Sequence, residues 1–254
     1  MVEPRAIDEE RARRPLAILV AGEALPEVGA LHGSFSAWIR AAAAPAWAGP
    51  WLEHDLRSGE DPPGAGSVSG IIITGSAASV TERASWMLRA EAHLRALVCA
   101  GVPIFGICFG HQLLGQALGG EVRKNPRGRE IGTVAVTAAS DDELFAGLPA
   151  SLTANSTHVD VVAELPPGAR VLATTALDPH AAIAFAPAVR GVQFHPEFAG
   201  AVMRGYVDVR RPLLLAEGLD ADAIARAASD TADARELIAN FVRWFVLADA
   251  RRAA

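Results

Sequence analysis

Cysteines are few in this sequence, and long apolar runs and metal- or phosphate-binding motifs are missing from it; each shortage excludes a class of protein. The chain contains only two cysteines, Cys99 and Cys108, among its 254 residues, too few for a disulfide-built scaffold. No apolar run is long enough to span a bilayer, so we expect no transmembrane helix and no membrane partner. No group of cysteines and histidines has zinc-site spacing and no glycine-rich phosphate loop occurs, so the sequence predicts no metal and no cofactor.

Lysine is scarce as well, and acidic residues outnumber basic ones by 29 to 23. There is one lysine, Lys124, and the formal net charge of −6 argues against a nucleic-acid partner, because such a surface needs clustered basic residues. The densest basic stretch, residues 123–129, is interpreted as a solvated loop rather than an anion or partner site. Residues 1–14 are mostly charged or small, contain no signal segment and are predicted to form a solvated tail. Cys99 is interpreted as a small buried residue, which favours a reducing, cytoplasmic location.

The order of the expected elements indicates an α/β fold. Short apolar runs alternate with stretches of helical spacing, which predicts a doubly wound, mixed and mostly parallel sheet flanked by helices, in a single domain over residues 15–248. Ligands are expected outside the carboxyl ends of the strands. Thr81 is the expected N-cap of the second helix. The expected strands are 16–21, 69–74, 102–107, 131–137, 154–162, 171–175, 182–185 and 189–194, and the expected helices are 38–44, 82–98, 109–118, 213–228 and 232–247.

The pentapeptide 106–110, Gly-Ile-Cys-Phe-Gly, lies between an expected strand and an expected helix. Its glycines allow a sharp turn with Cys108 at the corner, because strand and helix backbones approach closely there. The thiol would sit over the N-terminus of the helix, whose unpaired N–H groups favour the thiolate and can hold an oxyanion. We therefore predict that Cys108 is a nucleophile. His111, further along the same helix, is expected only to pack.

A nucleophile of this kind needs a base, and residues 191–197, Gly-Val-Gln-Phe-His-Pro-Glu, supply one. Alternating apolar residues before His195 indicate the end of a strand, and Pro196 fixes the backbone there. Residues at i and i+2 of an extended segment share a face, so Glu197 can accept a hydrogen bond from one imidazole nitrogen while the other faces the sulfur. Cys108, His195 and Glu197 are thus predicted to form a catalytic triad.

These residues and three further motifs occur in the order found in the class I, triad-type glutamine amidotransferases, and the chain resembles that family. The resemblance covers roughly residues 15–200 and is to stand-alone members similar to the glutaminase domain of GMP synthase, a group that also resembles gamma-glutamyl peptidases. One departure is Val159, which stands where glycine is commoner in GMP-synthase-like domains. The matching stretches are residues 106–112, 195–197, 73–76 (Ile-Thr-Gly-Ser), 129–132 (Arg-Glu-Ile-Gly) and 156–160 (Ser-Thr-His-Val-Asp).

The resemblance implies further site residues and an activity. The backbone N–H groups of Gly75 and Phe109 are expected to form an oxyanion hole, and Gln112 to contact the substrate, with His158 as a second substrate-binding candidate. The implied activity is hydrolysis of the side-chain amide of glutamine through a thioester on the cysteine, with no cofactor. Because the sequence contains no recognisable nucleotide-binding synthetase domain, the ammonia is expected to pass to a separate synthetase subunit or to be released.

Two alternatives stay open. One is a gamma-glutamyl peptidase that uses the same triad on a glutamyl amide whose nitrogen carries a peptide or conjugate. The other is a partner-dependent regulatory subunit that is nearly inactive alone. The pocket is expected to be walled by a loop over residues 33–38 and by residues 200–211, which are either a connector or a roof over the site. Arg204, Arg210 and Arg211 in the second stretch are candidates to meet a peptide carboxylate.

Overall fold

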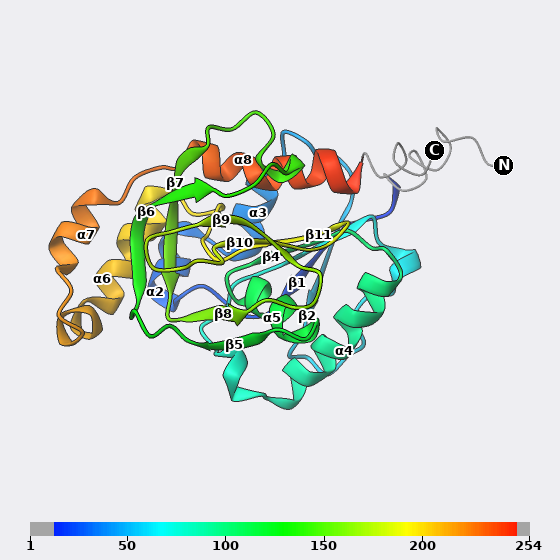
Figure 1. The fold of residues 1–254 in the computed structure, drawn as a ribbon, viewed down its shortest axis with the longest axis horizontal. Helices are drawn as coiled ribbons and strands as arrows, with labels where there is room; N and C mark the ends of the chain where they lie inside the picture. Colours follow the sequence, from blue (N-terminus) through cyan, green and yellow to red (C-terminus); the bar gives the residue numbers. More distant parts are fainter. Residues whose placement is uncertain (1–12, 248–254) are drawn as a thin grey trace.

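The computed structural model describes residues 13–247, and one large sheet forms the centre of this part of the chain (Figure 1). The sheet has nine strands in the order β2-β1-β3-β4-β11-β10-β9-β6-β7, of which β10 and β6 run against the direction shared by the others. Its strands are β1 (Leu16–Val20), β2 (Trp51–Asp55), β3 (Gly70–Ile73), β4 (Ile104–Ile107), β6 (Glu130–Ala138), β7 (Ser151–His158), β9 (Arg170–Thr174), β10 (Ala182–Ala186) and β11 (Val189–Val192).

A small ladder and several helices complete the structure. The ladder pairs β5 (Glu121–Lys124) with β8 (Asp160–Glu164) in antiparallel fashion. The α-helices are α2 (Pro26–His32), α3 (Phe35–Ala43), α4 (Ser85–Cys99), α5 (Phe109–Ala117), α6 (Gly200–Ala216), α7 (Ala221–Ala227) and α8 (Ala232–Phe241). The short turns are the 3₁₀ segments η1 (Ala65–Ser67), η2 (Val80–Glu82) and η3 (Glu143–Phe145) and the π-helical segment η4 (Val242–Val246).

The alternation of side chains along β1 explains the two layers of helices. Leu16 and Ile18 join a buried cluster with α3 and α8, whereas Ala17 and Leu19 join a cluster with α4 and α5 on the opposite face. Figure 1 shows α3 and α8 above the sheet and α4 and α5 below it. A third cluster, formed by α2, α6 and α7, packs against β6. Because helices cover both faces, the central strands are apolar along their whole length, as in β3.

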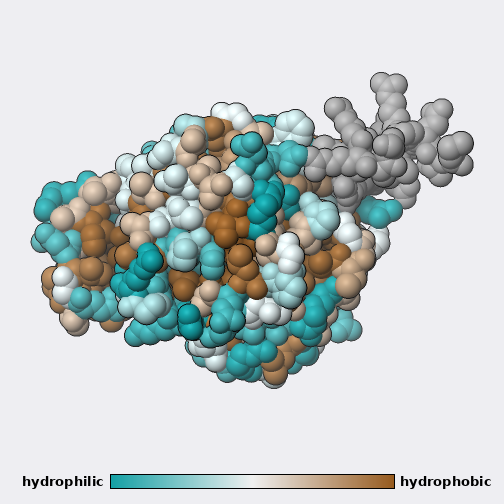
Figure 2. All heavy atoms as spheres, viewed as in Figure 1, coloured by the Kyte–Doolittle hydropathy of each residue, from teal (hydrophilic) through white to brown (hydrophobic). Residues whose placement is uncertain are grey.

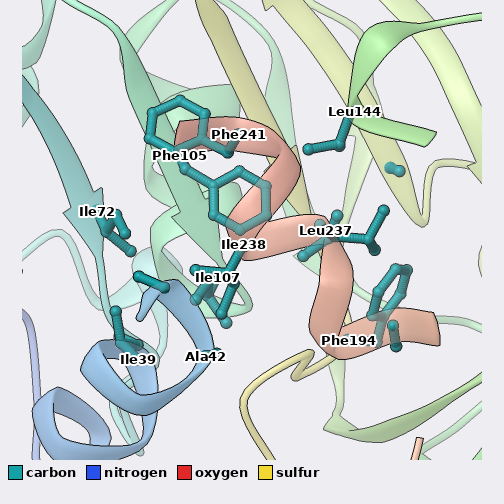
Figure 3. Packing of buried hydrophobic residues seen from close by; sticks show 14 of the residues in the cluster. Ile39, Ala42, Ile72, Phe105, Ile107, Leu144, Phe194, Leu237, Ile238 and Phe241 are labelled. Atoms are coloured by element: carbon teal, nitrogen blue, oxygen red, sulfur yellow. The ribbon is translucent and has the colours of Figure 1, made fainter. Parts of the chain in front are cut away.

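Phe105 of β4 packs against α8. Figure 3 shows its ring beside that of Phe241, with ring centroids 5.3 Å apart and an interplanar angle of 23°. Both side chains are fully buried. Strand β4 leads directly into the turn that holds Cys108, so this contact supports the strand on which the candidate site is built.

Phe105→Ala is expected to lower the free energy of unfolding by about 3–5 kcal/mol, because it removes a buried ring and leaves a cavity between β4 and α8. Chemical denaturation followed by circular dichroism measures the change. Leu31→Ala is the control, since Leu31 is 80% exposed and its truncation should change stability by less than about 0.5 kcal/mol. Equal midpoints for the two variants would contradict this account of the core.

The predicted fold class is confirmed, and most elements lie where the sequence places them. Strands β1, β3, β4, β6, β9, β10 and β11 and helices α3, α5 and α8 overlap the expected ranges. The predicted tail, residues 1–14, lies outside the described residues except for its last two positions, as does residue 248 at the other end of the predicted domain.

Two predicted elements have wrong boundaries. The strand expected over residues 154–162 is two strands, β7 and β8, because the chain turns at Val159, whose carbonyl accepts a hydrogen bond from the N–H of Asn125. The helix expected over residues 213–228 is also two, α6 and α7. Helix α6 already begins at Gly200 and continues through Pro212, so residues 200–211 form a helix and not an irregular connector.

The helix expected over residues 82–98 begins later than predicted. Thr81 is not its N-cap but part of η2, and Arg83, with φ of 54° in the left-handed region, separates η2 from α4. Cys99, the last residue of α4, is exposed and not buried. The residues expected to form a loop over 33–38 begin α3, whose N-cap is Ser34. Helix α2 and strands β2 and β5 were not expected.

The surface mixes polar and apolar side chains. Figure 2 shows an apolar group at the left end of the molecule, where Figure 1 places α6 and α7. Leu213 and Leu215 of α6 are among the exposed large apolar residues. Within residues 13–247, no helix combines the length and the apolar character needed to cross a membrane.

Candidate functional site

Cys108 occupies a strained turn between β4 and α5. Its φ of 51° and ψ of −102° lie in a region that residues other than glycine rarely adopt. The flanking glycines make this turn sterically feasible. A Cβ on Gly106 would come within 2.6 Å of the backbone of Gly110, and a Cβ on Gly110 would come within 2.7 Å of the carbonyl oxygen of Ile73. The predicted elbow is therefore present, with the cysteine at its corner.

The thiol lies at the N-terminus of α5 and is nearly buried. Only 6% of Cys108 is exposed, and the side-chain amide of Gln193 donates to Sγ at 3.6 Å. The first N–H groups of an α-helix have no partner within the helix, and that of Phe109 is directly beside the sulfur in the chain. These donors and the helix dipole favour negative charge at this position.

The segment that carries His195 is fixed to the sheet on two sides. The N–H of His195 donates to the carbonyl of Asn155 in β7 at 2.7 Å, and the N–H of Cys108 donates to the carbonyl of Val192 in β11 at 2.8 Å. The Asn155 side chain in turn donates to the carbonyls of Phe198 and Ser229. Strand pairing thus sets the position of the histidine relative to the cysteine.

The imidazole of His195 is held by a carboxylate and by aromatic rings. Its Nδ1 lies 2.7 Å from Oε1 of Glu197, and its ring stacks on Phe198 with centroids 4.0 Å apart. Both His195 and Glu197 are buried. Burial alone would lower the pKa of His195, but the charges of Glu197 and Cys108, and hydrogen bonds with both, raise it to about 10. With its pKa raised in this way, the imidazole of His195 is favoured in its protonated form at neutral pH.

Gly75, which follows β3, lies against the same imidazole. A Cβ at this position would lie 2.8 Å from Cε1 of His195, so only glycine fits without displacing the ring. Within the described residues, the N–H groups of Gly75 and Phe109 donate no hydrogen bond to a backbone or side-chain acceptor. These are the two donors that the sequence analysis assigned to the oxyanion hole.

Two adjoining cavities open at the thiol. The larger has a volume of about 240 Å³ and is lined by Gln112, His158 and Asp160, among others. The smaller, about 20 Å³, is lined by His195, Phe35 and Tyr206. The residues that line both are Ser76, Ala77, Cys108, Thr157 and Arg210.

Gln112 and His158 line the larger cavity but are already engaged within the protein. Nε2 of Gln112 donates to the carbonyl of Asp160 and to Oε1 of Gln193. The ring nitrogens of His158 are hydrogen-bonded to the carbonyl of Asp160 and to Oε2 of Glu130, each at 3.1 Å. His158 therefore braces Glu130, and its contact with a substrate stays a prediction.

The sequence comparison decides the family. The model of the family "Glutamine amidotransferase class-I" matches residues 51–206, which include the turn at Cys108 and the segment with His195 and Glu197. The chain belongs to the class I glutamine amidotransferases. It is similar to "GMP synthase [glutamine-hydrolyzing]" of Thermomicrobium roseum, with 42% identity over 138 residues that cover 52% of this chain and 24% of that protein. The chain thus spans about a quarter of the length of this relative.

Solved structures of other amidotransferases share the fold. A glutamine amidotransferase from Thermotoga maritima superposes with a TM-score of 0.74 at 19% identity, covering 91% of this chain and 98% of that one. A glutamine amido transferase from Methylobacillus flagellatus superposes with a TM-score of 0.65 at 24% identity, covering 94% of this chain and 93% of that one. The likeness extends over the sheet and its flanking helices.

Helix α6 adds two side chains to the site of this class I amidotransferase. Tyr206 and Arg210 reach the cavities at the thiol, so residues 200–211 act as a roof over the site. The other two arginines of this stretch point elsewhere. Arg204 donates to the carbonyl of Ala228, and Arg211 pairs with carboxylates of α6 and α7.

Arg129 corrects the interpretation of residues 123–129 as a solvated loop. Residues 121–124 form β5, and the side chain of Arg129 is only 11% exposed and lines the larger cavity. It makes a two-pronged ion pair with Glu217 at the end of α6, at 2.8 and 3.0 Å. This pair fastens α6 to the start of β6 in the amidotransferase.

Sequence reasoning missed Gln193, Asn155 and Tyr206. Gln193 lies two positions before His195, where alternation along a strand could have placed it on the same face as the histidine. Asn155 and Tyr206 carry no local signal, because their roles depend on which strands and helices meet. His111 is fully buried against Phe185, as expected of a packing residue. Residues 13–247 contain no group of three or more metal-ligating side chains.

Proposed function

We propose that the chain hydrolyses the side-chain amide of glutamine to glutamate and ammonia through a thioester on Cys108. The observation that carries this proposal is the thiol at a left-handed turn and helix N-terminus, in one cavity with His195, whose imidazole is hydrogen-bonded to Glu197. Thiol, imidazole and carboxylate supply a nucleophile, a proton carrier and a group that orients the proton carrier.

The first half of the reaction forms the thioester. The thiolate of Cys108, whose proton is held by His195, attacks the side-chain carbonyl carbon of glutamine. The negative charge that develops on the carbonyl oxygen is stabilised by the N–H groups of Gly75 and Phe109. His195 then gives its proton to the amide nitrogen, the carbon–nitrogen bond breaks, and ammonia leaves.

The second half releases the acid. Water attacks the thioester while His195 takes its proton, the carbon–sulfur bond breaks, and glutamate leaves as the thiol is restored. Glu197 keeps the imidazole in place through Nδ1 and stabilises its protonated form, in keeping with the raised pKa of His195. Gln112 and His158 border the glutamyl part of the substrate in this proposal.

The size of the two cavities favours glutamine over a gamma-glutamyl peptide. The leaving nitrogen must lie near His195, and the cavity there, about 20 Å³, has room for roughly one water-sized molecule. Ammonia fits this space, whereas the residue that follows a gamma-glutamyl bond would meet Phe35 and Tyr206. The larger cavity, about 240 Å³, accommodates the glutamyl group.

The relatives support a proposal for the fate of the ammonia. The chain matches a quarter of a glutamine-hydrolysing GMP synthase, whose name implies a further activity outside the matched part. We propose that a separate synthetase subunit accepts the ammonia, with no cofactor, nucleic acid or membrane involved in the hydrolysis, and that the enzyme acts in the cytoplasm. A subunit that is active only when bound to its synthetase is the alternative.

The expected result for the purified chain is a specificity constant for glutamine at least about tenfold above that for gamma-glutamylalanine, because the dipeptide must displace the aromatic wall beside His195. Ammonia release and alanine release are measured separately. Cys108→Ala protein supplies the background for both substrates. A dipeptide preference of tenfold or more would show a peptidase, and absence of both activities would favour the partner-dependent subunit.

A further inference from the structure

Arg210 is a charged side chain at the candidate site that has no acidic partner among residues 13–247. It is half-buried, donates to the hydroxyl of Thr157, and lies over the ring of Tyr206 at 5.3 Å. It makes no ion pair with any of residues 13–247, whereas its neighbour Arg211 pairs with Asp208 and Asp222. A partly buried guanidinium that lacks a carboxylate is a costly arrangement unless a ligand supplies the anion.

The other arginine of the cavity, Arg129, adds to this positive charge. Arg129 lies close enough to influence Arg210, but its own guanidinium is committed to Glu217 through two hydrogen bonds. Burial, followed by the nearby charge of Arg129, lowers the pKa of Arg210. A bound anion would counteract both the burial of the guanidinium and the repulsion from Arg129. The cavity wall at Arg210 therefore favours a ligand with negative charge.

The rest of the larger cavity matches an amino-acid head group. Asp160 is the one acidic side chain among the described residues that line it, and it makes a hydrogen bond to Ser79 but no ion pair within residues 13–247. An α-amino acid presents one carboxylate and one ammonium group. The cavity offers one unpaired arginine and one unpaired carboxylate, together with the nucleophile Cys108.

We propose that Arg210 binds the α-carboxylate of the glutamyl substrate in bidentate fashion. The inference rests on the proposed function, since it names the part of the substrate that this cavity recognises. The planar fork of arginine fits a carboxylate better than a point charge does. Glutamine residues inside a peptide chain have no free α-carboxylate, so the contact selects free glutamine and related γ-glutamyl compounds.

Arg210 lies outside the part of the chain that the family model matches, which ends at residue 206. The turn at Cys108 and the segment of His195 lie within the matched part. The proposed contact thus comes from a part of α6 that the family model does not match.

The experiment compares glutamine with its α-amide, which keeps the reacting side chain but lacks the α-carboxylate. Arg210→Gln should lower kcat/KM for glutamine by about 10- to 100-fold, chiefly through KM, and that for the α-amide by less than about threefold. Arg210→Lys should be intermediate for glutamine. The control Arg211→Gln, on the same helix but outside the cavities, should stay within about twofold of the wild type for both substrates.

Equal losses on glutamine and its α-amide would assign Arg210 a structural role, and unchanged kinetics on glutamine would also overturn the inference. Calorimetric titration of glutamine into Cys108→Ala protein, with and without Arg210→Gln, separates this inference from the proposed function. Binding weakened tenfold or more supports the role of Arg210 even if the wild type releases no ammonia, a result that would overturn autonomous hydrolysis alone. Binding indifferent to Arg210, or no binding, would overturn the assignment.

Discussion

Cys108→Ser protein is expected to lose ammonia release from glutamine by a factor of about ten thousand or more while keeping its fold. The hydroxyl keeps the size and position of the thiol but is far harder to ionise beside the same histidine. Loss of a nucleophile that acts together with a base removes nearly all of the chemical step. Turnover of glutamine in a coupled glutamate assay measures the loss, and circular dichroism checks the fold.

Cys99 provides the matched control for this prediction. It is the other cysteine of the chain, and it is exposed at the end of α4, so a reagent can reach it. Cys99→Ser should retain the activity of the wild type. An electrophilic diazoketone analogue of glutamine should label Cys108 in wild-type and Cys99→Ser protein, as located by peptide mass spectrometry. Specific labelling of Cys99 in place of Cys108 would contradict the assignment.

The second large effect concerns the partners of the thiol. His195→Ala should cost about as much activity as the loss of Cys108, because no other group can carry the proton between thiol, leaving nitrogen and water. Glu197→Gln should remain about 10- to 100-fold more active than His195→Ala, since it disturbs the orientation and charge of the imidazole but leaves the proton carrier in place. The turnover number of each variant measures the difference.

An NMR titration of the imidazole separates the role of Glu197 further. The charge of Glu197 is the largest contribution that raises the pKa of His195, so Glu197→Gln should shift this pKa downward from about 10. If both His195→Ala and Glu197→Gln left turnover close to that of the wild type, the pair would have no part in the chemistry.

The turn at Cys108 was predictable because its requirements are local. A strand, a helix and one glycine two positions to each side of the central residue suffice to fix the geometry. The close contacts at Gly106 and Gly110 explain why no larger residue fits at either position. The His195–Glu197 contact was predictable for the same reason, since both residues lie on one short segment. Their meeting with Cys108 depends on the pairing of β11 with β4, which a mostly parallel sheet allows but the sequence analysis did not specify.

The errors arose where packing between distant segments decides the outcome. Cys99 looked like a continuation of an apolar helix, but the buried side of α4 is set by Met87, Leu94 and Leu97, and the last residue turns away from it. Helix α6 was hidden because Pro212 suggested a boundary that the structure does not have. Nothing in the local sequence indicated that Arg129 pairs with Glu217, because 88 positions separate the two residues.

Helix α6 extends past the stretch that the family model matches, which ends at residue 206, and continues to Ala216. In the proposed mechanism, bonds are made and broken by Cys108, between β4 and α5, and by the segment after β11, whereas α6 only walls the cavities. Such a division lets mutations change α6 and the reacting side chains separately during evolution. If Arg210 binds the substrate as proposed, changes along the later turns of α6 would alter which amino acid is accepted while the reaction itself continues, and an engineer seeking new substrates would begin there.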